Sequence, residues 1–398
     1  MNFDEIPLEC QIAIVGAGPA GLVTALKLSE KGYKDIVLID KRDPWREPVA
    51  CAEAVHKGGL ASVVEIGEDW IRSDVDGVDF YSPNGTKVRY KKENSGVILD
   101  RGKMHYDLAL RCQKAGVKCH FKTLVKDITE VNLDKRTIHF TQEGEAKSLK
   151  AALVVEASGA AKFLSKSDTV LDDEHMDVEP AVFALVEGIP YDEKYIAMYY
   201  GEAYAPGGYA WVFPRGNGVA NVGVVCDRAH VKSHPPRKML KKLVERFWPD
   251  AKIGVLHGGP IPCGQNKSQI ATEALFRVGD AADMVNPLSR AGILEAMFAG
   301  KFASEAIDRY FKEDASSREE IYQEYFEKWW EKKGLEHFQF QKAKLPFGSI
   351  SDKSLDRAAG KLSKLPQEKM TMFRILWATV SSAPSLIWKM RGLYFKPK

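Results

Sequence analysis

The chain has 398 residues, of which 45% are hydrophobic and 28% are charged, and its formal net charge at pH 7 is +3. This length is too great for one ordinary core and predicts at least two domains, while the hydrophobic content excludes a disordered chain. The net charge is small, and no basic stripe with stacking aromatics is evident. We therefore expect no nucleic-acid partner.

The six cysteines include no C-x-x-C pair, and no histidines stand at zinc-finger spacing, so neither a metal site nor a disulfide framework is favoured. The first residues lack the basic and apolar regions of a signal peptide. No apolar run approaches the roughly 20 residues that a membrane-spanning helix needs. These features predict a cytoplasmic protein in a reducing compartment.

Residues 10–41 have the pattern of one βαβ dinucleotide-binding unit. An apolar run at 12–15 predicts a strand, and residues 20–31 predict the helix that follows it. Between them, glycines at G-x-G-x-x-G spacing allow a tight turn, close approach of a pyrophosphate and close helix packing. The first N–H groups of the helix favour the phosphates. These glycines are Gly16, Gly18 and Gly21.

A second apolar run, 36–39, ends at Asp40, which lies 19 residues beyond Gly21 and is placed to accept a hydrogen bond from a ribose 2′-hydroxyl. Ala20 and Lys41 stand beside these positions and complete the expected cofactor site. The unit by itself does not separate NAD from FAD.

A second cofactor signal lies at residues 275–307, where a short strand reaches Gly279-Asp280 and a helix is expected after Asn286-Pro287. A carboxylate at a strand end can bind a polyol hydroxyl, and a helix amino terminus can offer N–H groups to a flavin ring. NAD has no ribityl chain to be held in this way, so the segment favours FAD. The alternative is an ordinary loop in which Asp280 caps the next helix.

An alternating aromatic pattern occupies residues 206–225. Tyr209, Trp211 and Phe213 are two residues apart, so on a strand all three project from one face. Such alternation also fits the core of a half-buried sheet. Upstream, Pro48, Cys51 and Glu53 form a P-x-x-C-x-E element.

With these motifs the chain resembles the FAD-dependent geranylgeranyl reductase family, within the aromatic-hydroxylase-like flavoproteins. The resemblance spans about residues 12–307. It implies an α/β fold with three parts: a Rossmann-like FAD-binding domain of the hydroxylase and glutathione-reductase type, an antiparallel-sheet substrate domain and a C-terminal helical region. We expect the FAD-binding domain at 1–75, 96–170 and 270–313, the substrate domain at 76–95 and 171–269, and the helical region at 314–398.

The resemblance also implies roles for individual residues in FAD binding. The glycine-rich turn and Asp40 would hold the ADP half, Arg101 would lie near the pyrophosphate, and Asp280 belongs to the second FAD motif. Asp283 and Arg290 stand where the family often has glycine. The loop beside the flavin ring would contain Pro287, Gly292 and Ile293.

The implied activity is reduction of C=C bonds in a geranylgeranyl chain, on a prenyl lipid or diphosphate, by hydride transfer from reduced flavin with protonation. Such a bond gains cation character as it is protonated, and aromatic faces in a dry pocket suit that charge. We assign Tyr209 and Trp211 to this role. Cys51 either tunes the flavin or relays a proton, or it is a buried structural cysteine. NADPH and ferredoxin both remain open as electron donors.

Two other flavin chemistries stay open on the sequence. One is a flavin-dependent monooxygenase, which would consume oxygen with its substrate. The other is an electron-transfer flavoprotein linked to quinone, although the chain lacks an iron–sulfur cysteine cluster.

After about residue 314 the composition shifts towards helix formers, with apolar positions at helical spacing. One interpretation is a helical domain that covers the core. The other is a peripheral surface that rests on the inner face of the membrane, and the two are compatible. Its interfacial aromatics would be Trp377, Trp388, Tyr394 and Phe395, and its lipid-facing cations Lys389, Arg391, Lys396 and Lys398.

Overall fold

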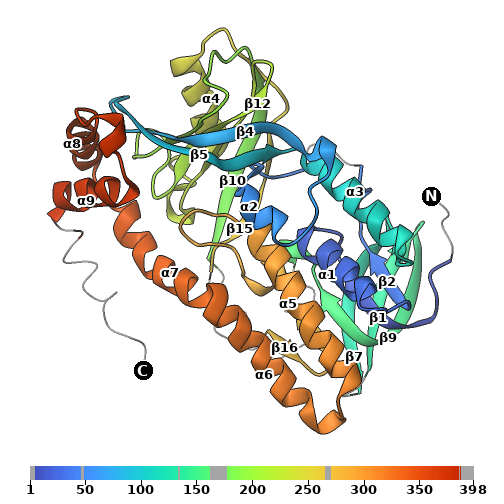
Figure 1. The fold of residues 1–398 in the computed structure, drawn as a ribbon. Coiled ribbons are helices and arrows are strands. Elements are labelled where there is room, and N and C mark those ends of the chain that lie inside the picture. Colours follow the sequence, from blue (N-terminus) through green and yellow to red (C-terminus); the bar gives the residue numbers. More distant parts are fainter. Residues whose placement is uncertain are drawn as a thin grey trace.

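The computed structural model describes residues 5–45, 49–132, 135–161, 177–264, 270–384 and 386. Within these residues, two β-sheets lie side by side and helices cover them, and the last helices extend past the second sheet (Figure 1). The predicted α/β class and the predicted C-terminal helical region are confirmed.

The first sheet contains the dinucleotide-binding unit. Its main strands follow the order β16-β17-β9-β1-β2-β6, and β1 pairs in parallel with both β2 and β9. β7 and β8 extend β9 as antiparallel strands. The strand bounds are β1 Glu9–Val15, β2 Ile36–Ile39, β6 Lys118–His120, β7 Leu124–Asn132, β8 Lys135–Gln142, β9 Glu145–Glu156, β16 Ala271–Thr272 and β17 Leu275–Arg277.

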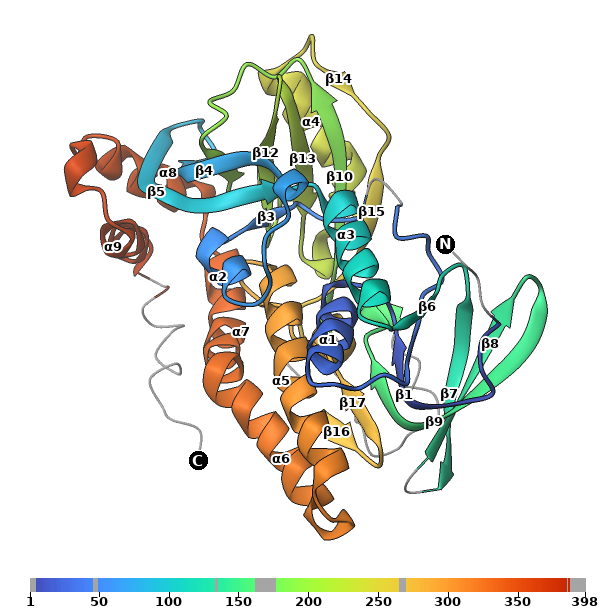
Figure 2. The same ribbon diagram turned by 45° about the vertical axis from the view of Figure 1, so that its right-hand side comes forward.

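Both faces of the first sheet are covered. Ile12 and Ile14 of β1 pack with helices α1 (Pro19–Glu30), α3 (Arg101–Lys114) and α5 (Ile293–Lys312). Ala13 and Val15 point the other way and pack with β7 and β8 (Figure 2). Parallel strands buried on both faces need apolar side chains at every position, which explains the unbroken apolar runs of β2 and of residues 12–15 in β1.

The second sheet follows the order β14-β10-β13-β12-β11-β4-β5-β3, with β15 also paired to β10. Its pairs are antiparallel as predicted, except that β11 runs parallel to β4. Helix α4 (Pro236–Phe247) covers one face. The strand bounds are β3 Ala54–Val55, β4 Ile71–Tyr81, β5 Lys87–Leu99, β10 Val178–Glu187, β11 Ile196–Tyr199, β12 Tyr209–Gly216, β13 Val219–Val225, β14 Lys252–Ile253 and β15 His257–Pro262.

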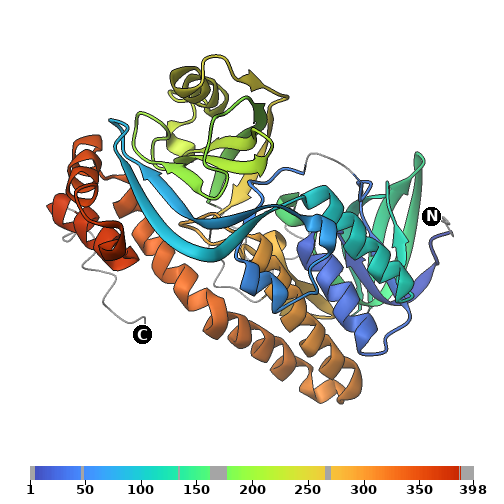
Figure 3. The ribbon, with the colours of Figure 1, turned by 45° about the horizontal axis from the view of Figure 1, so that its top comes forward.

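The β4–β5 hairpin spans the molecule. It arches from the amino end of α3 to the last helices (Figure 3). Its strands run further than the segment 76–95 assigned to the substrate domain, because β4 starts at Ile71 and β5 ends at Leu99. The domain boundaries themselves stay a prediction. Short helix α2 (Lys57–Ala61) follows β3 and packs on β5.

The C-terminal region is helical throughout its described part. α6 (Arg318–Trp329) passes through a π-helical turn at Trp330–Gly334 into α7 (Leu335–Gly348), which leads to α8 (Asp352–Leu362) and α9 (Met372–Ser382). None of the described helices is long and apolar enough to span a bilayer. Trp388 and the other aromatic and basic residues expected after it lie outside the described residues.

Helix α4 begins at Pro236, because proline without an N–H suits the first helical position. One predicted helix start was early. α5 begins at Ile293 rather than directly after Pro287. The side chain of Asn286 accepts hydrogen bonds from the backbone N–H groups of Leu288 and Ser289, and this holds the intervening residues as a loop.

His337 makes the stability of the C-terminal helices depend on pH. It is buried in α7, its Nε2 has no hydrogen-bond partner in the described structure, and its ring packs edge-on to Trp329. Burial, with a smaller effect of Lys333, lowers its pKa from 6.5 to about 4. Since protonation is then easier in the unfolded chain, this contribution to stability is present above pH 6.5 and is lost as the pH falls towards 4.

We therefore expect the free energy of unfolding to decrease by about 1.4 kcal/mol per pH unit from this group between pH 6.5 and 4. Denaturant unfolding of the wild type and of His337→Gln measures it, and the difference between their slopes removes the contribution of the carboxylates. Equal slopes in the two proteins would contradict the assignment.

Candidate active site

The glycine-rich turn has the tight packing that its sequence predicts. A Cβ on Gly21 would lie 1.9 Å from the carbonyl oxygen of Gly16, and one on Gly16 would lie 2.2 Å from that of Ala157. Gly16 also has a φ of +111°, which side chains rarely adopt. A Cβ on Gly18 would meet nothing within 4 Å, so the turn is closed on its inner side and open at Gly18.

The open side of the turn is suited to a dinucleotide phosphate. Gly18 is the N-cap of α1 and supplies no side-chain cap, so the first N–H groups of the helix are available to an anion. Asp40 accepts hydrogen bonds from the backbone N–H groups of Ala17 at 2.7 Å and Arg42 at 2.7 Å. It therefore holds the turn, and Lys41 is exposed beside it.

The second cofactor segment lies against the first. A Cβ on Gly279 would meet the Cβ atoms of Ala20 and Ala296, both at 3.2 Å, so α1, α5 and the 3₁₀ turn Gly279–Ala282 converge there. A Cβ on Gly292 would lie 3.6 Å from Oδ1 of Asp280, which brings that carboxylate to the amino end of α5. Gly292 provides no side-chain cap for α5. Two uncapped helix starts and two glycine turns thus meet in one region, as FAD requires.

We call residues 286–292 the flavin loop. Two non-glycine residues in or beside it stand at positions where the resemblance leads us to expect glycine. Asp283, just before the loop, and Arg290 within it have φ values of +53° and +58°. Both positions therefore have the left-handed conformation that favours glycine, at a cost of roughly 1–2 kcal/mol each for other residues. Glycine at either position would adopt this backbone without that cost.

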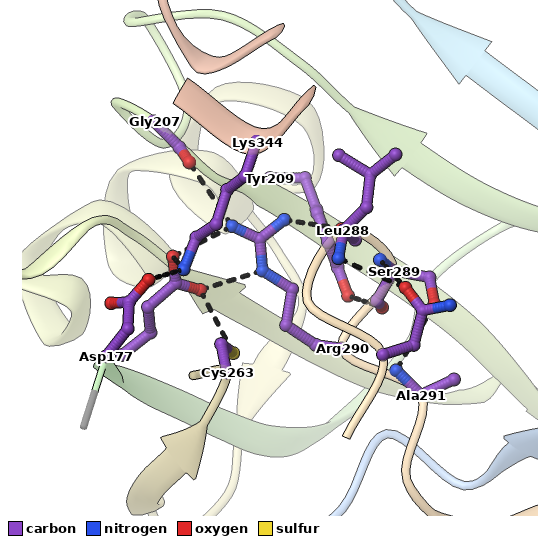
Figure 4. Close-up of polar contacts among 11 residues, drawn as sticks. Asp177, Gly207, Tyr209, Cys263, Leu288, Ser289, Arg290, Ala291 and Lys344 are labelled. Atoms are coloured by element: carbon purple, nitrogen blue, oxygen red, sulfur yellow. Dashed lines mark hydrogen bonds and ion pairs between the residues drawn. The ribbon is translucent and has the colours of Figure 1, made fainter. Parts of the chain in front are cut away.

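The side chain of Arg290 belongs to a buried ion cluster, and its contacts there offset the backbone strain (Figure 4). Its Nε and Nη2 donate to Glu179 at 2.7 and 3.1 Å, and its Nη1 and Nη2 also donate to the carbonyls of Leu288 and Gly207. Lys344 of α7 donates to the same Glu179 carboxylate at 2.7 Å and pairs with Asp177. Burial opposes the charge on Lys344, but the two acids outweigh it and raise its pKa.

The aromatic side chains of β12 share one face, as the alternation predicts. Tyr209, Trp211 and Phe213 are buried together. The ring centroid of Trp211 lies 6.1 Å from that of Tyr209 and 6.3 Å from that of Phe213. We call these three residues the aromatic wall. The hydroxyl of Tyr209 donates to the carbonyl of Ser289 in the flavin loop at 2.5 Å, so the wall adjoins that loop. Burial raises the pKa of Tyr209 above its usual range, and the phenol keeps its proton.

Cys51 lies against Arg101. The Arg101 guanidinium donates to the Cys51 sulfur at 3.0 Å and contacts His105 at 2.9 Å. Burial, with the nearby Arg101 and Arg42 charges, lowers the pKa of His105 well below its usual value, so His105 is neutral. The Nε of Arg101 is buried without a hydrogen-bond partner among the described residues, and such an atom suits an anionic group that is yet to bind.

An apolar cavity of about 470 Å³ lies between the second sheet and the C-terminal helices. Arg290 of the flavin loop forms part of its wall. Tyr200 also lines it and faces Tyr209 at a centroid distance of 6.0 Å, although Tyr209 and Trp211 are not lining residues themselves. The other apolar lining residues include Phe80, Leu288, Phe340, Phe347, Ile350, Leu355, Leu362, Met372, Ile375 and Leu376.

Residues 177–259 match the geranylgeranyl reductase catalytic domain, and residues 11–181 match the lycopene cyclase protein family. The digeranylgeranylglycerophospholipid reductase of Methanosarcina acetivorans is 34% identical over 392 residues, covering 96% of each chain. The enzyme of the same name from Methanosarcina mazei is 33% identical over 395 residues, again covering 96% of each chain. The chain belongs to the geranylgeranyl reductase family.

Solved structures of this family and of other flavoproteins share the fold. A geranylgeranyl bacteriochlorophyll reductase-like protein from Thermoplasma acidophilum superposes with a TM-score of 0.87 at 24% identity, over 97% of this chain and 99% of that one. The flavin-dependent halogenase CmlS superposes with a TM-score of 0.71 at 16% identity, over 96% of this chain and 78% of that one. As a member of the geranylgeranyl reductase family, the protein is an FAD-dependent oxidoreductase.

The residues predicted to bind FAD lie in one region, and the residues predicted to take part in catalysis lie beside it. Arg101 was predicted to lie near the pyrophosphate, but its hydrogen bonds go to Cys51 and His105. Its role at the pyrophosphate stays a prediction. Pro48 lies outside the described residues. Glu179, Tyr200 and Lys344 were not predicted from the sequence, because an isolated acid, tyrosine or lysine has no local signal for burial at a shared site.

An added methyl group should affect FAD binding on the open side of the glycine-rich turn and protein stability on its closed side. Gly18→Ala meets no protein atom, so the apoprotein should keep its melting temperature, whereas its Kd for FAD should rise by about tenfold or more because the methyl group occupies the phosphate's approach. Gly21→Ala should instead disrupt the turn and lower apoprotein stability. Calorimetric FAD titration and thermal melts of the apoproteins measure both effects. Gly259→Ala, also in open space, is the control, and unchanged FAD affinity in Gly18→Ala would refute the phosphate assignment.

Proposed function

We propose that this protein reduces C=C bonds in the geranylgeranyl chains of a membrane lipid. The observation that carries the proposal is the apolar cavity that ends at the flavin loop. A cavity with this lining excludes water and binds hydrocarbon through buried apolar area. Its position beside Leu288 and Arg290 would bring one part of a bound prenyl chain to the flavin, while the rest of the chain lies along the C-terminal helices.

The cofactor's part in this reaction is limited and specific. FAD, when bound and reduced, would supply a hydride to one carbon of the double bond, and a proton must add to the other carbon. The protein's own residues must bind the chain, exclude water and accommodate the positive charge that this protonation places on the carbon that receives the hydride. No carbonyl is present in the double bond to take up electron density, so this second task falls on neighbouring groups.

The aromatic residues fit that task. Tyr200 faces the cavity, and behind it the aromatic wall continues through Tyr209 to Trp211. Each ring face near a developing cation contributes about 0.5–2 kcal/mol. Burial raises the pKa of Tyr200 to about 12, so its phenol is protonated and neutral at ordinary pH. We assign Tyr209 and Trp211 to charge stabilisation and Cys51 to the flavin side of the site.

The decisive test is mass spectrometry of a geranylgeranyl glycerophospholipid after anaerobic incubation with the chemically reduced holoenzyme. Reduction before incubation removes the need for a natural electron donor, which is NADPH or ferredoxin in our proposal. Successive gains of two hydrogens are expected. No gain with lipid shown to bind would overturn the proposal. Product formation only when oxygen is present would favour a monooxygenase, and electron transfer to quinone alone would favour the electron-transfer alternative.

We also propose that α9 rests on the membrane surface from which the lipid is taken. Phe373 and Trp377 are 74% and 63% exposed, and Met372 and Leu376 are half exposed while also lining the cavity. The same helix therefore presents apolar side chains to the outside and to the lipid site. Arg374, also exposed, lies among them and can meet a lipid phosphate.

Exchanging Phe373 and Trp377 for serine should reduce binding to anionic phospholipid vesicles by at least about tenfold, because two interfacial anchors are lost. Cosedimentation of the purified protein with vesicles measures this. A double variant at exposed apolar residues elsewhere, Leu8→Ser with Val255→Ser, should bind as the wild type does. Equal loss in both variants, or no binding by the wild type, would contradict the assignment of α9.

A further inference from the structure

Asn221 connects Trp211 with Cys51, which lies 170 residues from Asn221 in sequence. It is fully buried on β13, on the same sheet face as the aromatic wall. Its Oδ1 accepts the indole N–H of Trp211 at 2.9 Å. Its Nδ2 donates to the carbonyl of Cys51 at 2.8 Å and to Oε2 of Glu53 at 3.2 Å. A single amide therefore contacts both proposed catalytic units.

The chemistry of these partners requires an amide at this position. The indole of Trp211 can only donate a hydrogen bond, and the Cys51 carbonyl can only accept one. Glu53 also accepts, because its other oxygen pairs with Arg215. Only a side chain with an acceptor on one side and donors on the other satisfies all three. A carboxylate would face Glu53 with like charge, and an apolar side chain would leave three buried polar groups unpaired.

Trp211 has little freedom apart from this hydrogen bond. Its ring covers Gly223 so closely that a Cβ there would lie 2.1 Å from Cζ2. The ring is thus held flat against β13, and the bond to Asn221 fixes its direction along the strand. Losing the bond would release the indole edge while the ring stays in contact with the sheet.

The Cys51 loop is held by the same residue. Glu53 has a φ of +74°, a conformation that non-glycine residues rarely adopt, yet it is buried and ion-paired. Its backbone N–H donates to the Cys51 sulfur at 3.2 Å, and its carbonyl accepts from Leu99 of β5. Burial raises the pKa of Glu53, against the lowering effect of Arg215 and Asn221. These contacts set the position of the sulfur relative to the wall.

We propose that Asn221 is a positioning residue for the reduction: through Trp211 and the Cys51 loop it fixes the distance between the aromatic wall and the thiol. This inference rests on the proposed function, because it assumes that Trp211 acts on the developing charge. Asn221 acts only through these two groups and makes no contact with substrate.

A double-mutant cycle tests the proposal. Trp211→Phe and Asn221→Leu should each lower kcat for prenyl reduction by about tenfold, with little change in KM or in FAD content. Because Asn221 acts partly through Trp211 and partly through the Cys51 loop, the double variant should lose clearly less activity than the product of the two single effects. Multiplying effects, about a hundredfold in the double variant, would overturn the proposal.

The control separates positioning from general loss of stability. Val222 neighbours Asn221 on β13 but packs on the opposite face, beneath α4. Val222→Ala weakens the same strand, and its effect on kcat should multiply with that of Trp211→Phe. If Asn221→Leu does not fold, Asn221→Asp replaces it in the cycle, since it keeps an oxygen for the indole and loses the donors for Cys51 and Glu53.

The two levels of inference fail in different ways. An inactive wild type would remove the proposed function and this inference with it. An active wild type together with unchanged kcat in Asn221→Leu would remove the inference alone.

Discussion

The carboxylate of Glu179 is fully buried, and two cations share it. Arg290 comes from the flavin loop and Lys344 from α7, while Glu179 itself belongs to the second sheet. One acid therefore joins the cofactor region, the aromatic sheet and the helices that line the apolar cavity. Removing one member of such a cluster typically costs about 3–5 kcal/mol, because an uncompensated charge remains buried. The relative position of the three parts depends on this cluster.

The site concentrates unfavourable backbone conformations that its neighbours compensate. Glu53, Asp283 and Arg290 have positive φ values although none is glycine. The side chains of Glu53 and Arg290 form buried ion pairs with Arg215 and Glu179. These ion pairs offset the backbone strain and also orient the Cys51 loop and the flavin loop. Backbone strain held in this way commonly accompanies sites whose geometry must be precise. Here it determines where the thiol and the flavin loop lie relative to the aromatic wall.

Local motifs correctly predicted two structural features, the glycine-rich turn and the shared face of β12. Backbone packs closely against Gly16 and Gly21, whereas Gly18 faces open space, and the spacing of the three glycines reflects this shape of the turn. Alternation at Tyr209, Trp211 and Phe213 predicted a shared face because side chains on a strand alternate strictly. The start of α5 was misplaced, since the hydrogen bonds from Asn286 that delay the helix depend on a loop conformation that composition does not specify.

The sequence by itself determined the cofactor class, the α/β fold and the residues that form the glycine turn and the aromatic wall. These features depend on contacts between residues close in the chain, or on a period that a strand or helix imposes. Only the tertiary structure decided that Asn221 meets Cys51, that Glu179 receives both Arg290 and Lys344, and that residues of the flavin loop line the apolar cavity. Those contacts join segments far apart in sequence, and no local spacing encodes which buried polar groups will find one another.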